Sequence, residues 1–509
     1  MKLTMPNMLL KRIRIIVAIV FFTAITLLFL DFTGTIHLWL GWLAKIQLMP
    51  AILTASIAII VFIAILTLLF GRIYCSIICP LGIFQDIVSR LASKRKKNRF
   101  TYSPALDWLR YGMLGVFIVL FIIGIHSAVA LLEPYSAYGR ITSNLFAPFY
   151  QWGNNLLAYF AGQVDSYAFY SVEVWLPGLV TFVAASLIFT VLIVLAWLGG
   201  RTYCNTVCPV GSVLGLLSRF SLFKLTFDTG KCKKCGLCEW NCKASCIDVK
   251  NLTIDGSRCV TCFKCMEKCK FGAMKYAPVK IGKKQNVGSE MVGKENSTND
   301  GVSRRSFLSV AGIFAFAQTV KAQQLRGDGG LADILDKKIP VRKTPIVPPG
   351  ATGLRNMNKY CTACQLCVSV CPTNVLRPSA KLATLMQPEM SYEKGYCRPE
   401  CTKCSQVCPT GAIRAITPAD KSAISIGKAV WIKDNCIVNR DEVQCNSCAN
   451  NCPTGAIMLI AVNQKDKNSL RIPIIDGELC IGCGACENLC PARPFSAVYV
   501  EGNVVHHSV

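Results

Sequence analysis

Long apolar runs fill much of the first 200 positions of this 509-residue chain, whereas the region beyond position 230 alternates short apolar stretches with polar, cysteine-rich loops. Crossing a hydrocarbon core of ~30 Å takes about 20 helical residues, and four runs approach or exceed that length. They cover residues 13–30, 48–70, 109–132 and 176–198. The pattern predicts an α-helical membrane domain with four transmembrane helices over residues 1–230.

Basic residues beside these runs predict the orientation of the helices, since cytoplasmic loops are enriched in Lys and Arg. Three basic residues within 11–14 precede the first run, and five within 94–99 follow the second. The loops 31–47 and 133–175 carry one basic residue each and are therefore expected outside. After the fourth run the chain returns to the cytoplasm. We expect a multi-pass protein of the bacterial cytoplasmic (inner) membrane.

Cysteines give the polar half its chemistry. Of the 29 cysteines, 24 form six consecutive quartets. The spacing C-x2-C-x2-C-x3-C followed by proline is that of bacterial ferredoxins, in which three thiolates bind one [4Fe-4S] cluster and the fourth reaches a neighbouring cluster. Two quartets have the full pattern: Cys361, Cys364, Cys367 and Cys371, and Cys480, Cys483, Cys486 and Cys490.

The other four quartets depart slightly from this pattern. Two have lysine, Lys243 and Lys270, in the place of proline: Cys232, Cys235, Cys238 and Cys242, and Cys259, Cys262, Cys265 and Cys269. Two have a longer first gap: Cys397, Cys401, Cys404 and Cys408 gain one residue, and Cys436, Cys445, Cys448 and Cys452 gain six. Ligation does not need the proline, so six quartets predict six [4Fe-4S] clusters, or about 24 Fe per chain.

Zinc ribbons and disulfides are the alternatives for these cysteines, because paired C-x2-C motifs also bind zinc and exported thiols can oxidise. Six four-cysteine runs, four of them ending in Cys-Pro, favour iron and sulfur, with the Cys436 quartet the least regular. Cys246 lies outside the quartets. It is expected to be a small buried apolar side chain, with a substitute cluster ligand as the alternative.

The membrane half contains an internal repeat. Residues 71–82 and 200–211 share the pattern Gly-Arg-x-Tyr-Cys-x3-Cys-Pro-x-Gly, each at the cytoplasmic end of an apolar run. Their four thiols could converge at one depth and form a seventh, pseudo-symmetric metal site: Cys75, Cys79, Cys204 and Cys208. Redox-active thiols and simple packing at helix ends, which proline terminates, are the open alternatives.

A second export signal is expected in the middle of the chain. The basic pair Arg304-Arg305 precedes a short apolar run and a small residue, as in a twin-arginine signal, although a basic turn before an amphipathic helix has the same pattern. The remaining predicted segments are a cytoplasmic two-cluster domain at 231–280, a polar linker at 281–302, the signal or anchor at 303–323, a Pro-rich linker at 324–357 and an exported four-cluster domain at 358–509. Both cysteine-rich domains are expected to be α+β and bacterial-ferredoxin-like, so the fold class is multi-domain.

Charge and histidine content narrow the function classes. The net charge of +26 lies largely beside membrane spans and in linkers, and we interpret it as topology and lipid contact rather than nucleic-acid binding. There is no C-x-x-C-H motif, and four histidines are too few to support a haem route. His126, with Glu133, could accept quinol protons near the outer face, although a satisfied interior histidine is the simpler interpretation.

The repeat followed by two cysteine quartets resembles the membrane ferredoxin subunit NapH, and the twin-arginine signal with four quartets resembles NapG, the exported partner in periplasmic nitrate-reductase systems. The chain therefore looks like a fused NapH/NapG-like quinol dehydrogenase, related in its membrane half to NosR and CcoG. The resemblance implies electron flow from membrane quinol to a periplasmic reductase. It also implies pairing of the first with the last exported quartet, and of the second with the third.

The leading hypothesis is a membrane-bound iron-sulfur electron-transfer protein that oxidises quinol and passes electrons to an extracytoplasmic reductase or carrier, without a terminal catalytic site of its own. An assembly or maintenance factor for a partner metalloenzyme, as the likeness to CcoG allows, is one alternative. A redox sensor with a cytoplasmic C-terminal domain is another. The expected partners are the quinone pool, the lipid bilayer and a periplasmic reductase or carrier.

Overall fold

The structure is a computed structural model that describes residues 5–93, 100–166, 168–174, 176, 178–278, 327–328, 332–333, 336–463, 465 and 469–509. Contacts divide the chain into two units. The first contains Met1–Val279, Ile339–Ala492 and Ser496–Val509, and the second Lys280–Lys338 with Arg493–Phe495. The predicted polar linker at 281–302 and the predicted signal, with Arg304 and Arg305, lie outside the described residues.

Two helices in the described part of the chain are long and apolar enough to cross a membrane, within α1 (Met5–Leu30) and α12 (Leu179–Gly199). Only 28% and 22% of their apolar windows are buried, so most of these side chains face outward. Such outward apolar surface is what a helix presents to lipid. These two helices indicate association with a membrane.

The other two expected spans are broken, so the prediction of four continuous transmembrane helices is not confirmed. Residues 48–70 divide into α4 (Leu48–Leu53) and α5 (Ile57–Phe70) because Ala55 takes a positive φ of 50°. Residues 109–132 divide into α8 (Asp107–Ile123) and α9 (His126–Leu132) at Gly124, where φ is 87°. A residue with a left-handed backbone conformation ends a helix. The apolar composition of a run does not reveal where such a residue lies.

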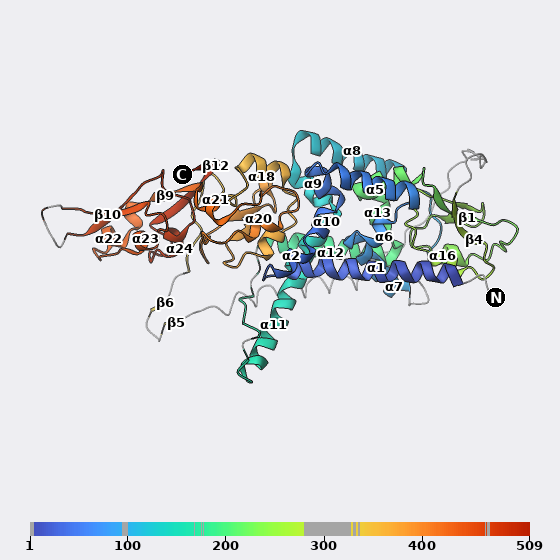
Figure 1. The fold of residues 1–509 in the computed structure, drawn as a ribbon, viewed down its shortest axis with the longest axis horizontal. Coiled ribbons are helices and arrows are strands. Elements are labelled where there is room, and N and C mark those ends of the chain that lie inside the picture. Colours follow the sequence, from blue (N-terminus) through green and yellow to red (C-terminus); the bar gives the residue numbers. More distant parts are fainter. Residues whose placement is uncertain are drawn as a thin grey trace, which may run out of the picture. The chain divides into compact units, whose positions relative to one another are not determined.

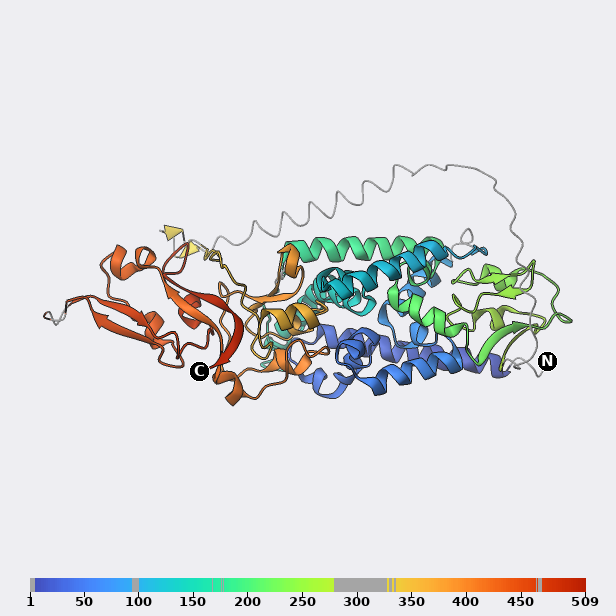
Figure 2. The same cartoon turned by 90° about the horizontal axis from the view of Figure 1, so that it is seen from above.

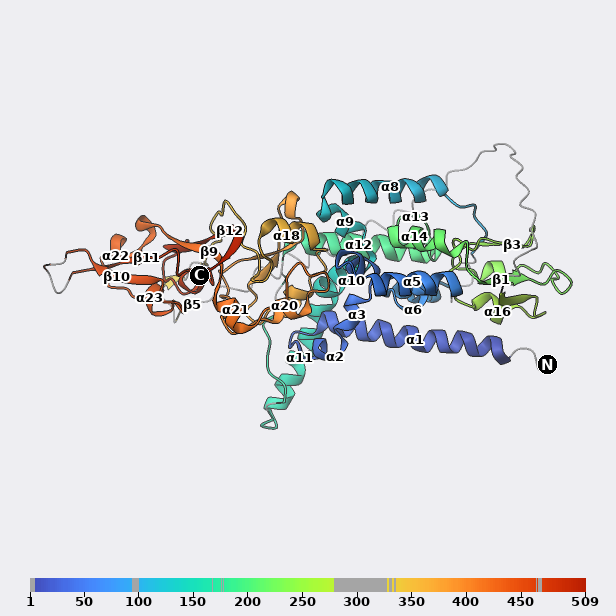
Figure 3. The ribbon, with the colours of Figure 1, turned by 45° about the horizontal axis from the view of Figure 1, so that its top comes forward.

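Several of the longer helices run in a similar direction (Figures 1 and 3). Shorter helices complete the helical part. They are α2 (Thr35–Leu40), α3 (Trp42–Lys45), α6 (Tyr74–Ile77), α7 (Pro80–Ser93), α10 (Pro134–Ile141), the π-helical turn Thr142–Phe146, α11 (Ala147–Gly162), α13 (Thr202–Thr206) and α14 (Pro209–Ser218). In the repeat, Pro80 and Pro209 open α7 and α14, since proline suits the first turn of a helix.

Every sheet in the described residues has two antiparallel strands, as the sequence predicts for ferredoxin-like units. The pairs are β1 (Phe223–Phe227) with β4 (Met274–Pro278), β2 (Ile247–Asp248) with β3 (Thr253–Ile254), β5 (Gly327–Asp328) with β6 (Ala332–Asp333), β7 (Leu376–Pro378) with β8 (Pro388–Met390), β9 (Ile424–Trp431) with β12 (Val498–Ser508), and β10 (Ile457–Ala461) with β11 (Arg471–Ile475). Two-stranded sheets are marginally stable by themselves, so other interactions must hold these units together.

Short helices contain, adjoin or follow the quartet cysteines. They lie in the green and the orange-to-red parts of the ribbon in Figure 2. They are α15 (Leu237–Trp240), α16 (Lys264–Lys268), α18 (Leu354–Tyr360), α19 (Leu366–Ser369), α20 (Lys403–Val407), α21 (Pro418–Ser422), α22 (Ile437–Arg440), α23 (Ser447–Asn450) and α24 (Ala485–Asn488). Short 3-10 turns cover Leu382–Thr384 and Lys433–Asn435. The quartets are therefore carried on loops that single helical turns close.

The loop of the Cys361 quartet packs directly on the helical part of the same unit. Buried Asn144 donates to the Gln365 Oε1 atom at 2.7 Å. A Cβ atom at Gly139 of α10 would lie 2.5 Å from the Cys364 carbonyl oxygen and 2.6 Å from the Phe29 ring. Only glycine allows this approach, so α10 sets the position of the Cys364 loop.

We therefore expect Gly139→Ala to destabilise the protein by about 1–3 kcal/mol, because the added methyl overpacks this contact and outweighs the ~1 kcal/mol helix-propensity gain of alanine. Thermal unfolding of the detergent-solubilised protein measures the change. Gly153→Ala in α11 is the matched control, since nothing lies within 4 Å of its Cβ position. Equal melting temperatures for the two variants would show that the contact has no such role.

Candidate iron-sulfur centres

Three hollows in the structure are each lined by four cysteines from two different quartets. In each hollow the first three cysteines of one quartet meet the last cysteine of another. The sets are Cys232, Cys235 and Cys238 with Cys269; Cys397, Cys401 and Cys404 with Cys371; and Cys480, Cys483 and Cys486 with Cys452. This exchange of the fourth cysteine is the arrangement of two-cluster ferredoxins.

The remaining quartet cysteines form three further groups, which we call the Cys259, Cys361 and Cys436 groups after the first cysteine of each quartet. Burial, followed by Cys262, Cys259 and Cys242, raises the pKa of the Cys265 thiol. Burial and then Cys361, Cys364 and Cys408 raise the pKa of Cys367. Burial and then Cys445, Cys490 and Cys436 raise the pKa of Cys448 to about 11. A bound metal reverses such shifts by holding the thiolate. Each group again combines three cysteines with an exchanged fourth.

The resulting pairs differ from those that the resemblance to NapG implies. The Cys361 and Cys397 quartets exchange their last cysteines, and so do the Cys436 and Cys480 quartets. The expected pairing of first with last and second with third is therefore wrong. The Cys480 and Cys397 quartets are nevertheless neighbours, because the Cys397 amide donates to the Cys483 carbonyl at 2.9 Å. The spacing within a quartet carries no information on which quartets pair.

Four quartets share an unusual backbone shape in their x2 gaps, with positive φ on each side of the second cysteine. The residues are Lys234 and Gly236, Thr261 and Phe263, Ala363 and Gln365, and Gly482 and Gly484. Alternation of right- and left-handed residues turns successive N–H groups inward, which favours an anionic group such as an iron-sulfur cluster. The two quartets with longer first gaps lack this shape, with φ −117° at Thr402 and −124° at Asn446.

Sequence reasoning missed an acidic residue, Asp86. It links the loop that follows Cys242 with the repeat that contains Cys75. Its carboxylate pairs with Arg14 at 3.1 Å, Arg201 at 2.6 Å and Lys243 at 2.5 Å, and all four side chains are largely buried. Burial alone would raise the pKa of Asp86, but Arg201 and Lys243, then Arg14, hold it well below its usual range. Lys243 stands where ferredoxins have proline, and that departure was the signal available in the sequence.

The four repeat cysteines are all buried, with exposures of 3–5%. Arginines cross between the two copies: Arg201 donates to the Cys75 carbonyl at 2.7 Å, and Arg72 donates to the Cys204 carbonyl at 3.0 Å. Burial and then Cys204, Cys79 and Cys75 raise the pKa of Cys208, so the four thiols lie near one another. The convergence predicted from the duplication is present. Within the described residues, no three Cys, His, Asp or Glu side chains meet at the spacing of a single metal ion.

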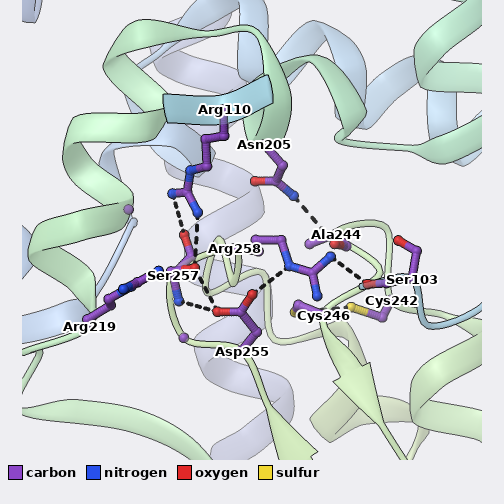
Figure 4. Close-up of polar contacts among 12 residues, drawn as sticks. Ser103, Arg110, Asn205, Arg219, Cys242, Ala244, Cys246, Asp255, Ser257 and Arg258 are labelled. Carbon is purple, nitrogen blue, oxygen red and sulfur yellow. Dashed lines mark hydrogen bonds and ion pairs between the residues drawn. The ribbon is translucent and has the colours of Figure 1, made fainter. Parts of the chain in front are cut away.

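A polar network holds the loop before Cys259 against the helices (Figure 4). Arg110 donates to Ser257 Oγ at 3.1 Å, and Ser257 Oγ donates to Asp255 at 2.7 Å. Arg258 also pairs with Asp255, at 2.6 Å.

Cys246 lies beside Cys242 (Figure 4), with 3.6 Å between the two sulfur atoms, and is 1% exposed. This burial suits the small packed thiol that the sequence predicts.

Two families match parts of the chain. The family described as "4Fe-4S binding domain" matches residues 52–99 and 181–228, which contain the two copies of the membrane repeat. The family described as "4Fe-4S dicluster domain" matches residues 360–412 and 443–493. The first of these two ranges contains both the Cys361 and the Cys397 quartets, and the second contains the Cys436 and Cys480 quartets except for Cys436 itself.

Curated relatives are ferredoxin-type proteins. The methylamine utilization ferredoxin-type protein MauM of Methylophilus methylotrophus is 31% identical over 163 residues, which cover 31% of this chain and 71% of MauM. The ferredoxin-type protein NapG of Escherichia coli is 30% identical over 174 residues, covering 31% of this chain and 74% of NapG. The chain belongs to the MauM and NapG family of ferredoxin-type proteins.

Membership of the MauM and NapG family makes this chain an iron-sulfur electron-transfer protein with 4Fe-4S domains. The putative electron transport protein YccM of E. coli is 23% identical over 200 residues, covering 38% of this chain and 47% of YccM. The chain spans about half to two thirds of the length of YccM and of two further relatives. No solved structure matches the chain significantly.

We expect Gly484→Ala to remove about 4 Fe per chain, the content of one [4Fe-4S] cluster, or about 8 if its paired site fails as well, from the ~24 Fe that six quartets predict. The new Cβ would lie 2.3 Å from the Tyr392 ring, at a residue with φ of 79°. Iron and sulfide analysis of anaerobically purified protein measures the loss. Gly411→Ala is the control, with φ of 71° but nothing within 4 Å. Full iron content in both variants would contradict the proposed tight loop.

Asp86→Asn should destabilise the protein by about 3–5 kcal/mol, because it leaves buried cations unpaired. The exposed pair Asp228–Lys275, at 2.9 Å, offers a control. Asp228→Asn should lower the melting temperature much less than Asp86→Asn, because an exposed ion pair stabilises a protein little. Because the folded pKa of Asp86 is depressed, its stabilisation is complete above the unfolded pKa of about 3.9 and declines as pH falls below it. Thermal melts between pH 3 and 8 test both points, and a variant as stable as wild type at neutral pH would contradict the assignment.

Proposed function

We propose that the chain is a membrane-bound electron conduit that oxidises quinol and passes electrons, through six [4Fe-4S] clusters, to an extracytoplasmic reductase or carrier. The 24 quartet cysteines would hold these clusters. The observation that carries the proposal is two series of thiol groups, each connected by direct contacts. One runs from the Cys232 hollow to the repeat cysteines, and the other from the Cys361 group to the Cys436 group. When bound, [4Fe-4S] clusters exchange single electrons, and their potentials depend on charge, hydrogen bonds and burial.

Contacts at the inner end connect the two-cluster unit with the repeat cysteines. Cys242 belongs to the Cys259 group, and the next residue, Lys243, pairs with Asp86. Asp86 in turn pairs with Arg201, which donates to the Cys75 carbonyl. These side chains fix the position of the inner cluster pair relative to the repeat thiols, without a mobile segment between them.

Contacts at the outer end extend the series. The Cys361 group adjoins the helices through Gln365 and Asn144. It exchanges cysteines with the Cys397 group, whose Cys397 amide donates to Cys483 of the next pair. The last two groups are again linked by exchange, at Cys452 and Cys490. Successive short steps matter because electron-transfer rates fall steeply with distance.

The contacts of α1 support cluster-binding parts on opposite sides of a membrane. Near the start of its apolar window, Leu9–Leu30, Lys11 pairs with Glu267 of the inner unit. Just beyond its other end, the Thr33 carbonyl accepts from Lys403 of the outer unit at 2.8 Å. Twenty-two helical residues span about 33 Å, close to the thickness of a hydrocarbon core. We therefore propose residues 231–280 as cytoplasmic and 324–509 as periplasmic.

A seventh metal site at Cys75, Cys79, Cys204 and Cys208 would shorten the gap between the inner and outer groups. Arg72 supports it, because this fully buried cation donates to the neutral groups of Asn205, Ser257 and Cys204, with the Cys75 sulfur 4.0 Å away. A buried cation favours a nearby anion, and metal-bound thiolates supply one. Thiol redox chemistry and packing are the outcomes that an iron count distinguishes from a metal site.

The decisive experiment mixes anaerobic, iron-replete protein with a reduced menaquinone analogue and follows cluster absorbance and low-temperature EPR signals. Wild type should be reduced by quinol. The Cys79→Ser/Cys208→Ser variant should retain about 24 Fe in its six clusters. The clusters on one side of the repeat should then be reduced more slowly than those on the other side. Gly411→Ala, which lies away from the repeat, should behave as wild type.

Reduction by dithionite but not by quinol would overturn the proposal and favour another donor or an assembly role. Equal rates for all clusters in the double variant would remove the relay at the repeat cysteines while leaving quinol oxidation intact. These two outcomes are distinguishable because dithionite reduces accessible clusters independently of any quinol site.

A further inference from the structure

Helices α8, α9 and α18 lie close together (Figures 1 and 3). Residues of these helices and the end of α4 line a pocket. Its volume is about 520 Å³. Binding sites for small molecules commonly measure about 300–1,000 Å³. The breaks at Ala55 and Gly124, which interrupt two expected spans, occur beside this pocket, and Gly124 lines it.

One wall of the pocket is apolar and reaches the outward face of the helices. It includes Phe121 together with Ile52 and Ile122, which are 40% and 77% exposed. Exposed side chains of this kind, on the helical part of a membrane-associated protein, form a path for a hydrocarbon tail. The wall therefore fits a ligand that enters from the lipid phase.

The other end of the pocket is polar. It contains His126, Asn358 and Lys359. The His126 ring stands edge-on to Phe121 at 5.3 Å, and the buried Oδ1 atom of Asn358 has no hydrogen-bond partner among the described residues. An unpartnered buried acceptor is costly and invites a donor such as a ligand hydroxyl. A flat ring with hydroxyls and an isoprenoid tail combines both chemical requirements.

The polar end adjoins the Cys361 thiol group. Tyr360 lines the pocket and directly precedes Cys361 in the chain. Ala363, within the same cysteine loop, packs in one cluster with Ala130 of α9 and Met386. The pocket and the outer thiol groups are therefore held by the same two elements, α9 and the loop that follows α18.

A second pocket in the helical part is less suitable. It lies between α5, α8 and α14, near Cys208, and its lining is entirely apolar, with Phe117, Val213 and Leu217 among its residues. A quinol bound there would bury two hydroxyls without partners, which costs free energy. That pocket would accept a lipid tail but offers nothing to recognise a quinol ring.

We propose that the pocket between α9 and α18 binds the quinol, with the ring at His126 and Asn358 and the tail along Ile52 and Ile122. The inference rests on the proposed function and adds where electrons enter. Oxidation of one quinol to quinone releases two electrons and two protons. The electrons would pass singly to clusters held by the Cys361 and Cys397 groups, and the protons would pass through His126 to water beside the exposed Arg355 and Lys359 at the polar end.

Photolabelling of the full-length, detergent-solubilised protein with an azido-quinone tests the site without relying on turnover. Wild-type label should map by mass spectrometry to peptides that contain His126 or Lys359. Ile122→Trp, which fills the mouth, and Asn358→Leu, which removes the acceptor, should each weaken labelling by about tenfold, equivalent to the loss of one good hydrogen bond. Val213→Trp, an apolar substitution of the same kind in the second pocket, should leave the labelling unchanged.

Label that maps to the second pocket and is lost in Val213→Trp would overturn the inference. So would unchanged labelling in both Ile122→Trp and Asn358→Leu, provided that these variants keep full iron content and so are folded. Rapid cluster reduction by quinol together with label elsewhere would leave the proposed function standing and remove only this site. Labelling at His126 without any cluster reduction by quinol would keep the binding site but remove its role as the entry point for electrons.

Discussion

The last cysteine of each quartet lies among the first three of another, and the ferredoxin-like parts of the structure depend on this exchange. Two-stranded sheets and helices of one turn supply little buried surface by themselves. Metal bound by thiolates contributes folding free energy directly, because no preformed site exists in the unfolded chain. Exchange therefore makes each pair of quartets a single cooperative element, and its two loops can close only together.

Charge deep inside the helical part is the second constraint. Arg72, Arg110, Arg140 and Arg201 are among the largest fully buried side chains. Of these, Arg201 pairs with a carboxylate, while Arg72 and Arg110 donate mainly to carbonyl and hydroxyl groups around Ser257. Buried cations need nearby negative charge. The thiol groups on both sides of these arginines are the natural source, so the electrostatics of the helical part and of the cluster sites are interdependent.

Repeated cysteine motifs in the sequence predicted the chemistry of the sites. The sequence did not reveal local backbone geometry or contacts between distant segments. Equal spacing and the duplicated Gly-Arg-x-Tyr-Cys motif correctly predicted convergent thiols, two-stranded units and a ferredoxin-type family. The helix breaks escaped because Ala55 and Gly124 lie in apolar runs, and their positive φ leaves no mark on hydropathy. The quartet pairing was not predicted because the spacing within a quartet does not identify its partner quartet. Asp86 was not predicted because its three partners come from distant segments.

Residues of the helical part and of both ferredoxin-like parts form one compact unit, joined by contacts such as Lys403 to Thr33 and Lys11 to Glu267. When such parts are separate polypeptides, each transfer must wait for a diffusional encounter, and the ratio of the parts depends on expression. Fusion fixes that stoichiometry at one to one. The rate of electron transfer within this chain is therefore independent of protein concentration.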